Sequence, residues 1–110
     1  MSLPRIIAVD FDGTLVEDEW PKIGKAKQRI VDYILFEKEE GSKIILWTNR
    51  RGKELIEAVN WCHDHGIDLD AVNEDIPEVI SHFGKSSRKI FAHEYLDDRA
   101  IHPKDLIGES

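Results

Sequence analysis

Residues 6–15 read IIAVDFDGTL, an apolar run that gives way abruptly to acidic residues, and this stretch decides the fold. The run at residues 6–9 is typical of a β-strand that is buried on both faces of a parallel sheet. Asp10 and Asp12 are one residue apart, so an extended backbone directs both carboxylates to the same side, and Gly13 permits a tight turn after them. The stretch therefore predicts a central strand that carries two carboxylates to the edge of a sheet.

In the rest of the chain, short apolar runs alternate with stretches in which apolar residues recur at helical spacing. Helices are expected over residues 25–40 and 53–65 and from 75–78 onward, and strands over residues 44–47, 69–72 and 90–96, with a weaker strand or turn at 105–107. This alternation predicts a single α/β domain, residues 1–110, with a mainly parallel sheet. Right-handed crossovers bring the carboxyl end of every strand to one edge, and ligands bind at that edge in such sheets.

Reactive side chains follow three of these strands. They are Asp10 and Asp12 after the first strand, Thr48, Asn49 and Arg50 after strand 44–47, and Asp97 and Asp98 after strand 90–96. Two like charges about 4 Å apart repel by ~4 kcal/mol at an effective dielectric constant of 20, so four gathered carboxylates need positive charge beside them. Mg²⁺ binds oxygen ligands such as carboxylates, water and a substrate phosphate. The strand ends therefore predict a Mg²⁺ site.

Two neighbouring carboxylates can divide one reaction between them, because one attacks phosphorus while the other exchanges a proton with the leaving oxygen. At this point the sequence resembles the haloacid dehalogenase (HAD) superfamily of phosphatases and phosphotransferases. The matching motifs are Asp10-Phe11-Asp12-Gly13-Thr14-Leu15, Thr48 after an apolar strand, and a lysine before Asp97-Asp98. The resemblance extends from Ile6 to about Arg99, and it is greatest to small members that consist of one uncapped domain.

The resemblance implies a three-layer Rossmann-like core and a Mg²⁺-dependent hydrolysis of a small-molecule phosphate monoester. It implies that Asp10 is the nucleophile, which forms an aspartyl-phosphate and also binds the metal. Asp12 would protonate the leaving group and then activate water, while its backbone carbonyl binds Mg²⁺. Asp98 matches the acid that binds the metal directly, and Asp97 matches the one that often acts through water.

The same resemblance implies the residues that hold the phosphoryl group. Thr48 would donate a hydrogen bond to a phosphoryl oxygen, together with backbone amides near Asn49. Arg50 is a further substrate-binding candidate, although it could equally be ordinary surface charge. Lys89, just before the last strand, best matches the catalytic lysine of the family, and Lys85 is the alternative.

No cap domain is expected, because only about nine residues separate Val16 from Lys25. These residues suffice for a short flap after the first strand, and they include Trp20 and Pro21. Trp20 could either pack against the flap or contact substrate. An uncapped site of this kind takes its specificity from the flap, from nearby polar residues or from a partner subunit, and it leaves room for a homodimer.

The composition limits the partners that we expect. A formal net charge of −7 disfavours broad binding to nucleic acid or to anionic membranes, since both require clustered cations. No apolar stretch approaches the ~20 residues of a membrane span, and the first residues lack the pattern of a signal peptide. The single cysteine, Cys62, excludes an intramolecular disulfide, and a cytoplasmic protein is expected. Zinc is not expected at residues 62–65, because no second cluster of ligands accompanies them.

Two other classes of protein remain open at this stage. A signalling domain similar to response-regulator receivers also places an aspartate, an acid pair, a threonine and a lysine on a parallel sheet. Receivers put the acid pair first, however, and they have no use for an acid/base at the position of Asp12. The third hypothesis is a non-catalytic Mg²⁺-binding or scaffold protein.

Overall fold

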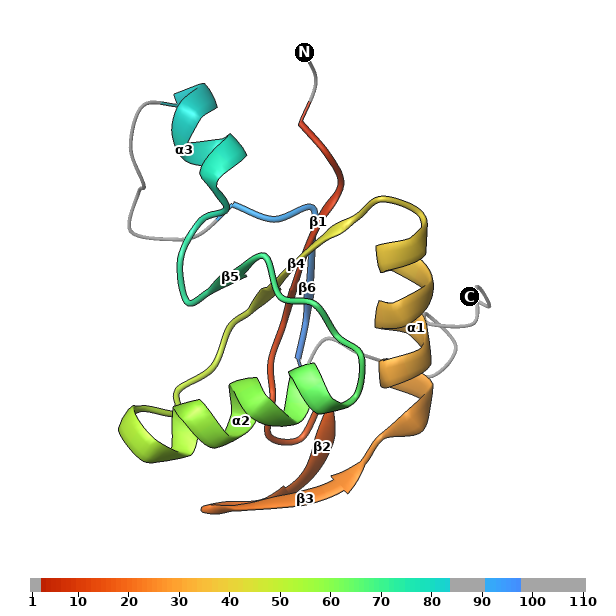
Figure 1. The fold of residues 1–110 in the computed structure, drawn as a ribbon, viewed down its shortest axis with the longest axis vertical. Coiled ribbons are helices and arrows are strands. Elements are labelled where there is room, and N and C mark those ends of the chain that lie inside the picture. The colour runs from red at the N-terminus through yellow and green to blue at the C-terminus, as the bar shows by residue number, and fades with distance from the viewer. Residues whose placement is uncertain (1–2, 84–90, 98–110) are drawn as a thin grey trace.

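The structure, a computed structural model, describes residues 3–83 and 91–97. A four-stranded sheet forms its centre, and every pairing in that sheet is parallel (Figure 1). The strands are β1 (Ile6–Val9), β4 (Lys43–Leu46), β5 (Ala71–Val72) and β6 (Glu94–Leu96), in the order β5-β4-β1-β6. All of β1 is buried, which confirms the prediction of a central strand covered on both faces.

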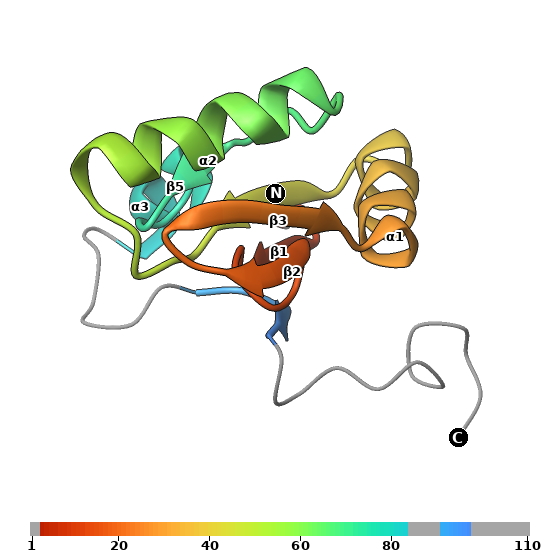
Figure 2. The same ribbon diagram turned by 90° about the horizontal axis from the view of Figure 1, so that it is seen from below.

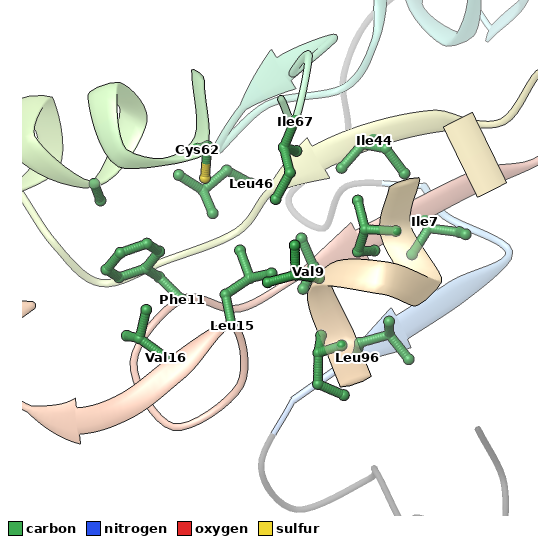
Figure 3. Close-up of a cluster of buried hydrophobic side chains, with 14 residues drawn as sticks. Ile7, Val9, Phe11, Leu15, Val16, Ile44, Leu46, Cys62, Ile67 and Leu96 are labelled. Carbon is green, nitrogen blue, oxygen red and sulfur yellow. The ribbon is translucent and has the colours of Figure 1, made fainter. Parts of the chain in front are cut away.

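Helices cover the two faces of the sheet, as the alternation of strands and helices predicted. The helices of the described residues are α1 (Gln28–Glu39), α2 (Gly52–Asp64) and α3 (Pro77–Phe83). Ile7 and Val9 of β1 pack in one core with buried residues of α1 and α2 (Figure 3). Ile6 and Ala8 face the other way and pack in a second core with Val79 of α3. The described chain therefore has three layers, with α1 and α2 on one face and α3 on the other.

The expected flap is a β-hairpin. It consists of β2 (Val16–Glu19) and the antiparallel strand β3 (Lys22–Ala26), joined through Trp20 and Pro21. β1 runs down Figure 1 toward this hairpin, and Figure 2 shows the hairpin from that end. A Cβ atom added at Gly24 would lie 2.0 Å from the backbone oxygen of Glu17, so the close approach of the two strands requires glycine there.

The structure corrects several predicted boundaries. The helix expected over residues 25–40 begins only at Gln28, because Lys25 and Ala26 belong to β3. The strand expected over residues 69–72 is limited to β5, and within residues 91–97 the last strand begins at Glu94. The weak element at residues 105–107 lies outside the described residues.

The start of α3 is tied to a distant part of the chain. The carboxylate of Asp75, just before α3, accepts a hydrogen bond of 2.6 Å from the backbone N–H of Phe91. Asp75 is 3% exposed, so the buried carboxylate joins the beginning of α3 to the segment that leads into β6. None of the described helices has the length and apolar character needed to cross a membrane.

The core makes a testable prediction at Cys62, which is completely buried. Burial raises the pKa of the Cys62 thiol from 9.0 to about 12, so almost no thiolate is present at pH 8. Because only the thiolate attacks a disulfide reagent, native protein should react with 5,5′-dithiobis(2-nitrobenzoate) at least ~100-fold more slowly than protein unfolded in urea. The release of the coloured thiolate measures both rates, and equal rates would mean that the thiol is not packed in the core.

Candidate functional site

The carboxyl ends of all four sheet strands line one open cavity of about 680 Å³. Val9 pairs with Leu46 on one side and with Leu96 on the other, so the residues that follow these strands lie at the same level of the sheet edge. The cavity is lined by Asp10 after β1, by Trp47, Thr48, Asn49 and Arg51 after β4, by Asn73 after β5, and by Asp97 after β6. The structure thus brings Asp10, Thr48, Asn49 and Asp97 together, as the sequence predicted.

Backbone hydrogen bonds fix the position of Asp10. Its N–H donates to the carbonyl oxygen of Leu96 at 2.9 Å, which extends the pairing of β1 with β6 by one residue. Its carboxylate accepts a hydrogen bond of 2.7 Å from the N–H of Phe11. These two hydrogen bonds hold the backbone and the carboxylate of Asp10 in place at the cavity.

Asn73 holds the loop that carries Thr48. Its side-chain oxygen accepts a hydrogen bond of 2.8 Å from the N–H of Thr48, and its own N–H donates to the carbonyl oxygen of Leu46 at 2.8 Å. Asn73 has a φ of 55°, a left-handed conformation that asparagine tolerates better than most residues. The hydroxyl oxygen of Thr48 accepts from the N–H of Arg50 at 3.2 Å, so its hydrogen can be donated to a ligand.

A smaller cavity of about 340 Å³ adjoins the first one beneath the flap. It is lined by Asp10, Asp12, Asp18, Trp20, Thr48, Asn49 and Arg50. Asp10, Thr48 and Asn49 line both cavities, so they stand at the junction between them. Asp18 and Trp20 come from the flap, and Trp20 is 55% exposed, which leaves much of its indole ring open to a ligand.

Asp12 and Arg50 form an ion pair of good geometry. Nε of Arg50 donates to one oxygen of Asp12 and Nη2 donates to the other, both at 2.7 Å. Arg50 is 1% exposed, and its Nη1 donates to the carbonyl oxygen of Glu54 in α2 at 3.3 Å. The hydrogen bonds with Asp12 raise the pKa of the Arg50 guanidinium above its ordinary value. Arg50 is therefore not ordinary surface charge, and its guanidinium is bonded within the protein.

Arg50 also binds the flap. Nη1 donates to the carbonyl oxygen of Pro21 at 3.3 Å, and Nη2 donates to that of Lys22 at 3.0 Å. The guanidinium carbon lies 5.0 Å from the ring centre of Phe11 and 5.0 Å from that of Trp20, which are cation–π distances. Trp20 thus packs against Arg50, and it also lines the smaller cavity; its contact with substrate stays a prediction.

The oxygen donors of the larger cavity suit a hard cation. Asp10 and Asp97 both line it, and Mg²⁺ commonly takes one or two carboxylates and completes its coordination with water and substrate. Residues 3–83 and 91–97 contain no group of three or more His, Cys, Asp or Glu side chains that could hold a metal. Asp98 lies outside the described residues, and so do both lysine candidates, Lys85 and Lys89.

Some side chains take roles that the sequence did not indicate. Trp47 is 40% exposed and lines the larger cavity. Nδ1 of His93 accepts a hydrogen bond of 2.9 Å from the N–H of Ile6, which gives this imidazole a structural role. Asn73 holds the N–H of Thr48, and the available signal for that role was a polar residue directly after strand β5.

Fold and site together define an α/β protein whose parallel strands direct acidic, hydroxyl and amide side chains into one cavity. The chain is similar in structure to the conserved protein coded by locus from Bacteroides thetaiotaomicron, with a TM-score of 0.80 and 39% sequence identity, over 96% of this chain and 87% of that one. It belongs to the same protein family as that conserved protein. Neither a protein-family model nor a curated protein matches the sequence.

The support of Thr48 by Asn73 can be tested with two substitutions. Asn73→Gly keeps the left-handed conformation but removes the acceptor of the Thr48 N–H, and we expect it to lower the free energy of unfolding by about 1 kcal/mol. Asn73→Ala adds the strain of a side chain at positive φ, so it should cost about 1 kcal/mol more. Urea unfolding measures both losses, and equal losses would contradict the contribution of the backbone conformation.

Proposed function

We propose that this protein is a Mg²⁺-dependent phosphatase of the HAD type, which hydrolyses a small-molecule phosphate monoester through an aspartyl-phosphate on Asp10. The observation that carries the proposal is the convergence of Asp10, Thr48 and Asp97 from three strands on one cavity, with Asp12 in the cavity that adjoins it. This arrangement combines a nucleophile, a hydrogen-bond donor for phosphate and an acid/base within one site.

In this proposal the larger cavity takes the phosphoryl group. An oxygen of Asp10 attacks phosphorus, the bond from phosphorus to the ester oxygen breaks, and the aspartyl-phosphate forms. The Thr48 hydroxyl donates to a phosphoryl oxygen, and the nearby cation of Arg51 attracts the anionic substrate. Asp10 and Asp97, with Asp98, are the residues that would hold Mg²⁺, which when bound neutralises the charge gathered between the carboxylates and the phosphate.

The smaller cavity takes the leaving group, because Asp12 lines it. In its protonated form Asp12 gives a proton to the departing ester oxygen, and the resulting carboxylate later takes one from the water that attacks the aspartyl-phosphate. That second step releases inorganic phosphate and restores the carboxylate of Asp10. The exposed indole of Trp20 lies beside this cavity, where it can contact the organic part of the ester. Arg50 holds Asp12 in this proposal, in place of the direct contact with substrate expected from the sequence.

The nucleophile is tested with Asp10→Asn. We expect wild-type protein to hydrolyse 4-nitrophenyl phosphate only when Mg²⁺ is present, and the variant to lose activity by ~10³-fold or more, because an amide is a poor nucleophile. Asp68→Asn is the matched control, since its side chain is 89% exposed and lies outside both cavities. Activity of Asp10→Asn near that of the control would refute the nucleophile, and an inactive wild type across a panel of phosphate esters would favour the non-catalytic Mg²⁺-binding protein.

The position of the leaving group is tested with Trp20→Ala. Loss of the indole should raise KM for aryl phosphates up to about tenfold, because one aromatic contact contributes about 0.5–1.5 kcal/mol. KM for glycerol phosphate should change much less, and Trp20→Phe should retain most of the affinity for aryl esters. Steady-state kinetics on the two esters measure the difference, and an equal change in KM for both would place the leaving group elsewhere.

A further inference from the structure

Arg50 connects three separate parts of the molecule through one buried guanidinium. It binds both carboxylate oxygens of Asp12 in the loop after β1, the carbonyl oxygens of Pro21 and Lys22 at the tip of the flap, and the carbonyl oxygen of Glu54 in α2. The guanidinium is planar and its N–H groups point in fixed directions. A displacement of the flap tip therefore changes the hydrogen bonds that hold Asp12.

The pairing fixes Asp12 without using up its oxygens. Each carboxylate oxygen accepts one hydrogen bond from Arg50, and each has further lone-pair capacity, which can accept a hydrogen bond from water or carry the proton that passes to an ester oxygen. Two parallel hydrogen bonds also set the plane of the carboxylate, which a single contact cannot do. Asp12 is 19% exposed in its side chain and lines the smaller cavity, so it stays accessible while Arg50 orients it.

The tip of the flap lines the same smaller cavity as Asp12. Trp20 lines that cavity and packs over the guanidinium of Arg50, so one side chain both borders the cavity and touches the residue that binds Asp12. Arg50 is 1% exposed, and a buried guanidinium that lost either partner would be left with unpaired donors. The flap tip and Asp12 therefore stabilise each other through Arg50, and this coupling acts in both directions.

We propose that Arg50 is the positioning residue that couples the flap to Asp12, so that a leaving group seated against Trp20 orients the carboxylate that exchanges a proton with the leaving oxygen. The catalytic half of this inference rests on the phosphatase activity proposed above, whereas the physical coupling of the flap to Asp12 does not.

The catalytic half is tested by comparing two leaving groups of similar shape. Phenyl phosphate has a basic leaving group that needs a proton, while 4-nitrophenyl phosphate has a weakly basic one that leaves without it. In Arg50→Met, kcat/KM for phenyl phosphate should fall about tenfold more than for 4-nitrophenyl phosphate, because a misplaced Asp12 loses part of its acid catalysis. A purely structural role would lower both values by the same factor.

Arg50→Lys keeps the positive charge but cannot bind both carboxylate oxygens of Asp12 at once. The larger loss of kcat/KM on phenyl phosphate should therefore persist in this variant. If Arg50→Met does not fold, Arg50→Lys can be measured in its place. In an Asp12→Asn background, Arg50→Lys should no longer change the ratio of the two kcat/KM values, since the residue that it positions has already lost its function. A ratio that still changes there would overturn the positioning role.

The physical half is tested by amide hydrogen exchange of residues 16–26, which needs no activity. Asp12→Asn and Arg50→Lys should both accelerate exchange in the flap about tenfold, because each weakens the charge-assisted hydrogen bonds that tie it down. Exchange in α1 should stay unchanged, and the matched variant Arg51→Lys should leave the flap as it is in the wild type.

The outcomes separate the two proposals. Flap exchange that does not respond to Asp12→Asn overturns the coupling, whatever the enzyme does. A wild type that hydrolyses both esters, with equal losses for both in Arg50→Lys, refutes the positioning role but leaves the phosphatase standing. A wild type that hydrolyses neither these two esters nor the rest of the phosphate-ester panel refutes the phosphatase and with it the catalytic half, while the exchange experiment still decides the coupling.

Discussion

The pairing of β1 with neighbours on both sides is the constraint on which the rest of the structure depends. Because β1 is buried on both faces and hydrogen-bonded along both edges, its end point cannot shift without breaking two ladders and two cores. Asp10 follows this fixed end, and its own N–H continues the pairing with β6. A side chain at this point therefore receives its position from the whole sheet and not from a local loop.

Charge is distributed differently around the two carboxylates of the central motif. Asp12 has a buried guanidinium as its partner, which compensates its charge within the protein. Asp10 lines the open cavity together with Asp97 and Arg51. The carboxylate of Asp12 is thus held by a buried cation, whereas that of Asp10 borders a cavity whose cation, Arg51, is exposed.

The sequence predicted much of this architecture, because its strongest signals are local. These signals are the apolar run before Asp10 and the helical periods before Gly41 and Gly66. Each one reflects burial against neighbouring elements, and the strand and helices that they predict were located correctly to within a few residues. β3 was missed, because no residue of Lys22–Ala26 is fully buried and the strand pairs only with the other strand of the flap. Its one apolar contact with the main core, through Ile23, is too little to give a periodic signal.

The convergence of Asp10, Thr48 and Asp97 could also be predicted, since parallel strands share one carboxyl edge. The pairing of Asp12 with Arg50 could not, because it joins residues 38 positions apart and depends on where the flap folds back. A buried arginine looks the same in a sequence as an exposed one. Its role became visible only when the acceptors around it, most of them backbone carbonyls, were placed in space.

The tight contact at Gly24 has a consequence for how this fold can diversify. Since any side chain there would collide with the backbone of Glu17, this point of the hairpin is closed to variation. Trp20 at the tip is 55% exposed and lies outside the buried core, although its ring contacts the guanidinium of Arg50. Related chains can therefore vary the tip more freely than the residue at Gly24, as long as Arg50 keeps its partners.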